Sequence, residues 1–291
     1  MIRNVERVIA APPYHWVGNG FRVHSFFPSA TNGIDGRRMS PWFLMDYESA
    51  YHFPPSLDPR GVEAHPHRGI ETVSIIYEGK VAHHDSVGNG GVIGKNDVQW
   101  MTAGSGILHK EYIEEEFNKQ GGVCQMVQLW VNLPQKYKMT KPKYQDLLFK
   151  DANKFISDNQ KVHLNIIAGN YKNIEGRADL LTPVELFDLT IAKGSKIDFS
   201  FNSKHNLGML VIDGIITIND RHSVQKDYFI LFENIGSEVT LFGEIDSKVL
   251  ILSGEPIEES IAPYGPFVMN NMNEIYEAFQ DYKNGKFGFL E

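Results

Sequence analysis

The 291-residue chain has little of the chemistry that cross-links a protein or anchors it to a membrane. It contains one cysteine, Cys124, which excludes an internal disulfide and favours a reducing compartment. The first ten residues lack the long apolar stretch of a secretory signal. No segment approaches the roughly 18 apolar residues that are needed to cross a bilayer. We therefore expect a cytoplasmic protein with no membrane partner.

Basic residues are also scarce. Lys and Arg total 28 against 36 Asp and Glu, which gives a formal net charge of −8. Direct binding to nucleic acid needs Lys and Arg concentrated on one surface, and the sequence has neither a basic run nor a basic amphipathic helix. It also has no heptad pattern of the coiled-coil type. We expect no direct nucleic-acid binding, and a monomer is the simplest expectation.

Short segments rich in β-branched and aromatic residues are present throughout the chain. Hydrophobic residues make up 42% of it, and glycines separate many of the segments. This pattern is typical of an antiparallel sandwich or barrel. Tight hairpin turns are expected at Gly79 and at Asp213-Gly214. We predict an all-β fold with strands at residues 71–79, 81–86, 92–94, 97–101, 125–133, 163–169, 184–191, 197–201, 208–219, 227–232, 238–242 and 247–254.

The length suits two domains of common size. Residues 137–159 mix Lys, Pro, Asp and Asn with little periodicity, which indicates a linker. We predict an N-terminal domain at 1–136 and a C-terminal domain at 160–291. The C-terminal domain should end in a short helix, because apolar residues recur at helical spacing from 272 to 283, with Asn271 or Asn273 as the helix cap.

Two pairs of polar residues stand out in the first half. His65 and His67 are separated by one residue, and so are His109 and Glu111, which follow the glycines of Gly104-Ser105-Gly106. On β-strands, side chains two residues apart share a face. Joining the two faces would give three imidazoles and one carboxylate, which suit Fe(II), Mn, Ni, Cu or Zn better than Mg or Ca. A His-x-His pair alone is often a surface feature, but the second pair favours a metal site.

These segments resemble the signature motifs of the pirins, a family of cupin proteins. The matching segments are HPHRGIETV (65–73), QWMTAGSGI (99–107) with His109 and Glu111, QLWVNLP (128–134) and YGPFVMN (264–270). The resemblance implies two tandem cupin barrels of the jelly-roll type, with one iron in the N-terminal barrel. It also implies the ligands His65, His67, His109 and Glu111.

The choice of carboxylate depends on the resemblance. In cupins generally this ligand comes from the first motif, where Glu71 stands, whereas pirins place it two residues after the last histidine, at Glu111. We therefore expect Glu111 to be the ligand, and Glu71, which has the same strand parity as His67, to be a supporting residue or a reserve ligand. His83, Gln99 and Gln128 are further candidates for orienting the ligands or lining the pocket. A surface position is an equally simple interpretation of His83.

The second half of the sequence repeats the strand pattern of the first half but lacks its candidate metal ligands. His205 precedes the Asp213-Gly214 turn, but residue 207 is leucine, so there is no His-x-His pair. A lone histidine is more often structural or solvated, because a metal site needs three or four converging ligands. We expect no metal in the C-terminal barrel.

The resemblance implies a metal-dependent dioxygenase, with Fe(II) as the expected ion, that acts on flavonols such as quercetin. The substrate 3-hydroxyl would bind at the metal beside O2, and Glu111 would be both a ligand and the catalytic proton acceptor. An alternative is a redox- or metal-sensing regulatory protein that binds a transcription factor or an enzyme. A structural protein with a vestigial site is the least favoured interpretation, because the four-ligand set is intact.

Overall fold

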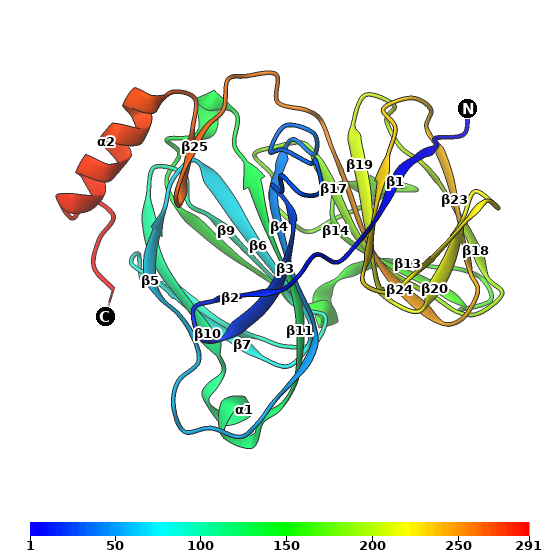
Figure 1. The fold of residues 1–291 in the computed structure, drawn as a ribbon, viewed down its shortest axis with the longest axis horizontal. Helices are drawn as coiled ribbons and strands as arrows, with labels where there is room; N and C mark the ends of the chain where they lie inside the picture. The colour runs from blue at the N-terminus through cyan, green and yellow to red at the C-terminus, as the bar shows by residue number, and fades with distance from the viewer. Residues whose placement is uncertain (291) are drawn as a thin grey trace. The chain divides into compact units, whose positions relative to one another are not determined.

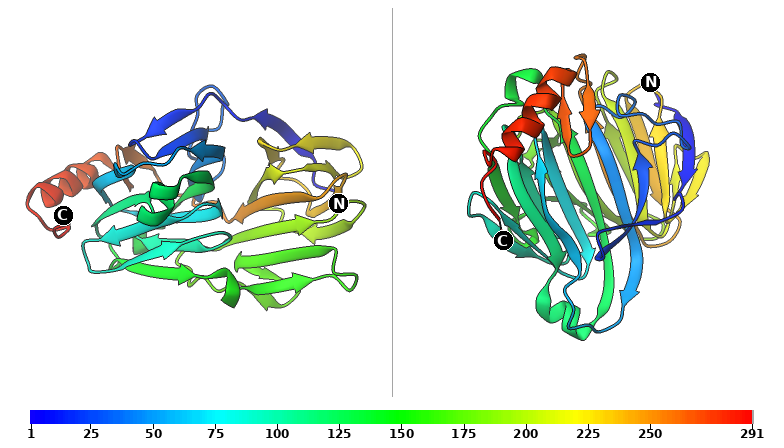
Figure 2. Two further views of the ribbon diagram at one scale, coloured as in Figure 1. Left: turned by 90° about the horizontal axis from the view of Figure 1, so that it is seen from below. Right: turned by 60° about the vertical axis from the view of Figure 1, so that its left-hand side comes forward.

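The structure is a computed structural model that describes residues 1–290 (Figures 1 and 2). Strands dominate, and the described chain has only two α-helices, so the predicted all-β fold class is confirmed. The chain forms two compact units, each with one seven-stranded and one four-stranded antiparallel sheet. The first barrel comprises residues 13–25, 43–149 and the segment from 257 onward. The second barrel comprises residues 1–12, 26–42 and 150–256.

In the first barrel, the larger sheet has the strand order β12-β9-β6-β11-β4-β3-β2 and the smaller one the order β5-β10-β7-β8. The chain order is β2 (His15–Val17), β3 (Phe21–Phe27), β4 (Trp42–Phe53), β5 (Gly61–His67), β6 (Ile70–Glu78), β7 (Val81–Asp85), β8 (Gly90–Ile93), β9 (Val98–Thr102), β10 (Ile107–Ile113), α1 (Glu115–Gln120), β11 (Gly122–Asn132), η1 (Gln135–Tyr137), β12 (Lys143–Leu147), β25 (Ala262–Tyr264), β26 (Phe267–Met269) and α2 (Met272–Lys283).

In the second barrel, the corresponding orders are β1-β22-β19-β24-β17-β14-β13 and β18-β23-β20-β21. Its elements are β1 (Val5–Ala10), η2 (Phe149–Asp151) at the boundary, β13 (Asn153–Ile156), β14 (Val162–Ala168), β15 (Asn170–Tyr171), β16 (Ile174–Glu175), β17 (Val184–Ile191), β18 (Lys196–Ser200), β19 (Asn206–Asp213), β20 (Ile215–Ile218), β21 (His222–Gln225), β22 (Tyr228–Phe232), β23 (Glu238–Gly243) and β24 (Ser247–Gly254).

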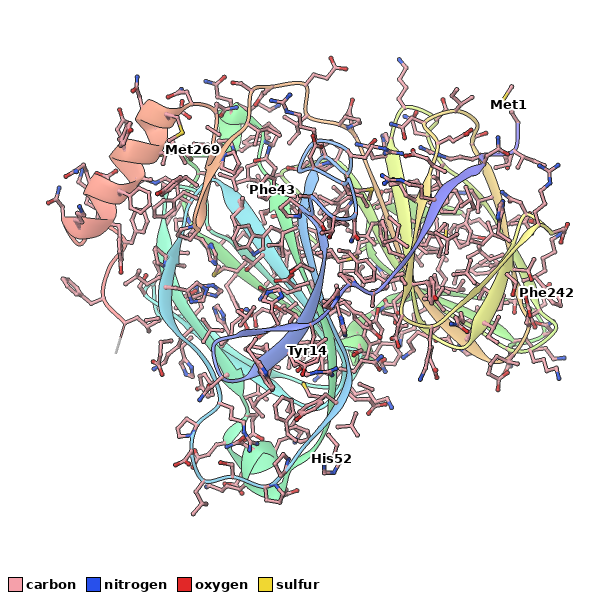
Figure 3. The ribbon with its side chains drawn as sticks, viewed as in Figure 1. Met1, Tyr14, Phe43, His52, Phe242 and Met269 are labelled. Atoms are coloured by element: carbon pink, nitrogen blue, oxygen red, sulfur yellow. The ribbon has the colours of Figure 1, made fainter. Side chains whose placement is uncertain are left out.

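Apolar side chains from both sheets meet inside each barrel (Figure 3). In the second barrel this interior is a continuous cluster of aliphatic and aromatic residues. In the first barrel, alternate residues of β10 point inward, and these are Ile107, His109, Glu111 and Ile113. The period-2 geometry of the strand therefore places two polar side chains on a buried, otherwise apolar face.

The turn at Gly79 differs from its prediction. Gly79 has a φ of +92° and does reverse the chain, but β6 and β7 belong to different sheets. Both edges of β6 are occupied by β9 and β11, so β7 pairs with β10 instead. The turn at Gly214, with a φ of +85°, likewise connects β19 and β20 in different sheets. Each turn is a corner between sheets and not a hairpin within one.

The domain boundaries also differ from those predicted. The predicted linker at 137–159 contains two edge strands: β12 pairs with β9, and β13 pairs with β14. An edge strand has one neighbour and tolerates the Lys and Asp that gave this segment its linker-like composition. The start of the chain, β1, pairs with β22 of the second barrel, while the C-terminal segment packs in the first. Sequence order therefore does not separate the two units.

The C-terminal helix α2 was predicted correctly. Asn271 is its cap, and its side chain accepts a hydrogen bond from the backbone N–H of Glu274. Ile275 and Ala278 are buried against a cluster that includes Phe267 of β26. None of the helices within residues 1–290 is long and apolar enough to span a membrane.

Lys138 is a buried cation that ties three segments of the first barrel together. Its Nζ donates to the carbonyl of Gly69 at 3.0 Å, to Oδ1 of Asn132 at 2.6 Å and to the carbonyl of Val268 at 2.7 Å. Lys138→Met would leave these acceptors without their donor, so we expect a loss of about 3 kcal/mol of unfolding free energy. Urea unfolding followed by tryptophan fluorescence measures it, with the exposed Lys141→Met as control. Equal stability of the two variants would contradict this role.

Candidate metal centre

Two neighbouring strands of the first barrel bring the predicted imidazoles together. β5 and β10 run antiparallel, and their register sets His109 opposite His65 and Ile107 opposite His67. The ring centre of His109 lies 4.3 Å from that of His65 and 4.8 Å from that of His67. One ring nitrogen from each histidine lies within 4.8 Å of the other two, which suits a shared metal ion.

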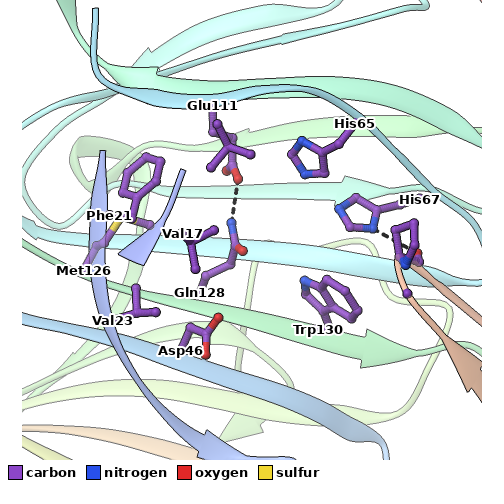
Figure 4. Close-up of a pocket in the computed structure, with 13 residues that line it drawn as sticks. Val17, Phe21, Val23, Asp46, His65, His67, Glu111, Met126, Gln128 and Trp130 are labelled. Atoms are coloured by element: carbon purple, nitrogen blue, oxygen red, sulfur yellow. Dashed lines mark hydrogen bonds between the residues drawn. The ribbon is translucent and has the colours of Figure 1, made fainter. Parts of the chain in front are cut away.

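The pairing of β10 with β5 shifts by one residue between His109, opposite His65, and Glu111, opposite Val62. The extra residue lies on β5, so β10 keeps its alternation and Glu111 stays buried on the same face as His109. Glu111 Oε1 accepts a hydrogen bond from Ser74 Oγ at 3.0 Å. Its Oε2 accepts one from Gln128 Nε2 at 2.6 Å, which Figure 4 shows as a dashed line. Ser74 and Gln128 come from β6 and β11, so the larger sheet orients a carboxylate carried by the smaller one. Glu111, His109 and His83 form a second group with donor atoms within 4.8 Å.

Backbone carbonyls set the tautomers of two of the imidazoles. His65 Nδ1 lies 2.8 Å from the carbonyl of Glu63, and His67 Nδ1 lies 3.1 Å from the carbonyl of Pro266. A carbonyl oxygen only accepts hydrogen bonds, so in the neutral ring Nδ1 carries the proton and Nε2 carries the lone pair. Both rings are therefore prepared to bind a cation through Nε2.

The third imidazole is oriented by another histidine. His109 Nδ1 lies 3.4 Å from His83 Nδ1, and both rings are fully buried. On its other side, His83 Nε2 lies 3.9 Å from Oδ2 of Asp85, and Tyr144 stacks on the His83 ring at 5.1 Å. Asp85 is held in place by hydrogen bonds from the backbone and side chain of Asn89. At 3.9 Å the contact between His83 and Asp85 is too long for a hydrogen bond, and His83 Nε2 is buried without one in residues 1–290. In the tautomer with its proton on Nε2, His83 would accept the hydrogen bond from His109 Nδ1–H through its own Nδ1.

This arrangement leaves His109 Nε2 with a lone pair and no protein partner. Among residues 1–290, that atom is buried and makes no hydrogen bond. A buried acceptor without a partner is costly and calls for an explanation, which a bound cation would provide. Three imidazole nitrogens and one carboxylate form a donor set that fits a first-row transition ion. The residues present thus fit the metal that the sequence predicts.

Burial lowers the pKa of two of the imidazoles, those of His67 and His109. Burial lowers the pKa of His67 to about 3, helped by the neighbouring His65 and opposed by the carbonyl of Pro266. Burial, together with His67, His65 and His83, holds the pKa of His109 well below its ordinary value. Neutral imidazole is the form that binds metals, so these two rings lose no proton when an ion enters.

A cavity of about 240 Å³ opens beside the imidazoles (Figure 4). His65, His67 and Glu111 form part of its lining, and Trp130 packs edge-on against His67 at 4.9 Å. Most of the remaining wall is apolar and consists of Val17, Phe21, Val23, Val62, Met126 and Pro266. A concave apolar pocket with a few polar groups suits a small aromatic ligand.

The supporting residues named from the sequence divide into two pairs. Gln128 contacts Glu111 and lines the cavity, and His83 contacts His109 from behind. Glu71 and Gln99 are buried in the larger sheet, but neither lines this cavity or belongs to a histidine group of the described chain. Glu71 accepts a hydrogen bond from Thr102 Oγ1 at 2.7 Å.

Sequence reasoning missed three contributors to the site. Ser74 and Asp46 lie on ordinary-looking strands, and only strand parity could have flagged them as inward-facing. Pro266 belongs to the fourth motif, but nothing in the sequence shows that its carbonyl meets His67, which is 199 residues away. Within residues 1–290, both groups with metal-binding potential lie in the first barrel.

The contact between His83 and His109 gives a direct prediction. His83→Leu removes the acceptor for His109 Nδ1–H, so the ligand can adopt the wrong tautomer, and we expect metal affinity to fall about 10- to 100-fold. Titration against a competing chelator measures this fall. His84→Leu changes the exposed neighbour on the same strand and is the matched control. Equal affinity of the two variants would show that His83 does not support the site.

Comparisons with known proteins agree with the motifs and the fold. Residues 20–131 match the family model for pirin, and residues 186–288 match that for the pirin C-terminal cupin domain. A Pseudomonas aeruginosa protein, provisionally named a quercetin 2,3-dioxygenase, is 43% identical over 273 residues, which covers 94% of each chain. Pirin-1 of Arabidopsis thaliana is 34% identical over 262 residues, or 88% of this chain and 86% of that protein.

A solved structure extends the similarity to three dimensions. The crystal structure of a quercetin 2,3-dioxygenase from Acinetobacter baumannii matches with a TM-score of 0.93 and 40% identity, over the full length of both chains. The similarity therefore includes both barrels and the strands that carry the histidines. On these sequence and structural matches, the chain belongs to the pirin family.

Proposed function

We propose that this protein is a metal-dependent dioxygenase that acts on flavonols such as quercetin, with Fe(II) as its ion. The observation that carries the proposal is a pair of candidate ligand groups that share His109: one holds His65 and His67, and the other holds Glu111. His65, His67 and Glu111 also line the apolar cavity. The names of the Pseudomonas aeruginosa relative and of the Acinetobacter baumannii structure support the same reaction class. We assign His65, His67, His109 and Glu111 as the ligands.

Each part of the site has a defined task in this proposal. When bound, a transition ion supplies Lewis-acid chemistry and open positions for the substrate oxygen and O2. Glu111 accepts the proton of the substrate 3-hydroxyl, while Gln128 and Ser74 hold its carboxylate in place. The apolar walls exclude water and orient the aromatic rings of the substrate, which lowers the entropic cost of reaching a reactive geometry.

Oxygen uptake by the purified, iron-loaded protein tests the proposal. We expect consumption of O2 that depends on both quercetin and metal. Absence of metal-dependent uptake with every flavonol and catechol tried would contradict the enzyme. The regulatory alternative would then be the one to pursue, through a search for a stable protein partner.

Metal removal should abolish the activity and leave the fold in place. Both barrels bury large apolar clusters that contain none of the proposed metal ligands. Chelation should therefore change the far-ultraviolet circular dichroism spectrum very little. Oxygen uptake and circular dichroism before and after chelation measure the two effects. Global unfolding on chelation would show that the metal is structural.

A further inference from the structure

One carboxyl group in the cavity has no task in the mechanism described above. Asp46 lies on β4 of the larger sheet and lines the same cavity as His65 and Glu111, which lie on the smaller sheet. In Figure 4, Asp46 lies on one side of Gln128, and Glu111 and His65 lie on the other. The cavity thus has a polar group on the wall remote from the proposed ligands.

The surroundings of Asp46 leave part of its hydrogen-bonding capacity unused. Ser25 Oγ, on the adjacent strand β3, donates to Oδ1. Oδ2 makes no hydrogen bond within residues 1–290 and is not fully buried, so it is open to a cavity whose lining includes Val23 and Met126. An accessible acceptor on a mostly apolar wall is a position at which a donor on a ligand can bind.

The protonation state of Asp46 decides whether Oδ2 accepts or donates a hydrogen bond. Burial raises the pKa of Asp46, whereas the Ser25 hydroxyl and the nearby His15 act in the opposite direction. The ionised carboxylate accepts at both oxygens, whereas the protonated one, with Oδ1 accepting from Ser25, carries its proton on Oδ2 and donates there. A phenolic hydroxyl can donate as well as accept, so it fits either form, while an aromatic carboxylate is repelled by the ionised form.

We propose that Asp46 is a specificity-determining residue that accepts a hydrogen bond from a phenolic hydroxyl on the ring remote from the metal-bound hydroxyl. The proposal rests on the proposed action on flavonols and narrows it. The preferred substrates are flavonols whose pendant phenyl ring carries a hydroxyl group. Flavonols with an unsubstituted ring leave Oδ2 without a donor, and this difference sets the selectivity.

Three flavonols that differ only in the pendant ring test the proposal. Quercetin carries two hydroxyls there, kaempferol one and galangin none, while all three share the 3-hydroxyl and the neighbouring carbonyl. Dissociation constants are measured for the iron-loaded protein under nitrogen, and kcat/KM is measured in air. We expect the wild-type protein to bind quercetin and kaempferol about 10-fold or more tightly than galangin, as a hydrogen bond to a charged group would give.

Two variants and one control separate recognition from stability. Asp46→Leu removes the acceptor at similar side-chain size. It should weaken the binding of quercetin and kaempferol but not that of galangin, which has no pendant-ring hydroxyl, so the preference over galangin should fall to less than about 3-fold. Asp46→Asn keeps a weaker acceptor and should fall between, so it tests the proposal even if the leucine variant does not fold. Asp58→Asn removes an exposed carboxylate of the same barrel and should keep the wild-type preference.

Two results would overturn the proposal. One is a wild-type protein without preference among the three flavonols. The other is an Asp46 variant that weakens all three equally, which would limit the residue to holding β3 and β4 together through Ser25. Binding is measured without O2, so it tests Asp46 separately from the reaction. If the protein binds quercetin and kaempferol selectively but does not turn them over in air, the proposed dioxygenase activity is rejected and the role of Asp46 in recognition is kept.

Discussion

His109→Ala is expected to lose bound metal and oxygen uptake together. His109 belongs to both groups of candidate ligands, and among the three proposed imidazole ligands it is the one whose Nε2 is buried without a hydrogen bond in residues 1–290. Removing a ligand outright should cost more than the 10- to 100-fold that is typical of a supporting residue, so we expect metal affinity to fall by more than about 100-fold. Metal content after dialysis and oxygen uptake of the same sample measure the two losses.

The control for this variant is another histidine of the same barrel. His52 is exposed at the end of β4, and His52→Ala should keep wild-type metal content. The truncation at position 109 also removes the ring that contacts His83, so circular dichroism must confirm that the barrel is folded. A folded His109→Ala protein with a full complement of metal would contradict the assigned ligand set.

Glu111→Gln is expected to harm turnover much more than metal retention. The amide oxygen still coordinates weakly and three imidazoles remain, but an amide cannot take the substrate proton. A lost general base typically costs about 100- to 10,000-fold in rate, and we expect a decrease of this size in turnover per bound metal. The readout is the rate divided by the metal content of each preparation. Unchanged turnover per metal would reject the proton-accepting role and leave Glu111 as a ligand only.

Glu71→Gln is the matched comparison for that experiment. Glu71 is also a buried carboxyl of the first barrel, but it bonds to Thr102 and does not line the cavity. Its replacement should reduce metal affinity and turnover less than either change above. Complete loss of metal from this variant would show that the ligand carboxylate comes from the first motif.

Local sequence rules were sufficient for the histidine-bearing strands. The alternation along β5 and β10 predicts that His65 shares a face with His67, and His109 with Glu111. It could not predict the extra residue on β5 between Val62 and His65, because a bulge depends on how the two strands pair. Gly79 and Gly214 were recognised as turns, but the same turn residues serve a hairpin and a corner between sheets.

Local sequence patterns could not predict contacts between segments that are far apart in the sequence. Periodicity does not show that β1 would complete the sheet of the second barrel, or that Pro266 would cover His67. The inward position of Asp46 follows from strand parity only once the sheet that holds β4 is known. The motifs identified the family, whereas the supporting residues required the tertiary structure.

The central claim is that one metal ion binds in the first barrel, and anomalous diffraction from a crystal of the iron-loaded protein tests it most directly. We predict a single strong peak at the iron edge, about 2.0–2.2 Å from the Nε2 atoms of His65, His67 and His109 and from a carboxylate oxygen of Glu111. A peak bound by His83 or Glu71, a peak in the second barrel, or no peak beside the three imidazoles would contradict the account.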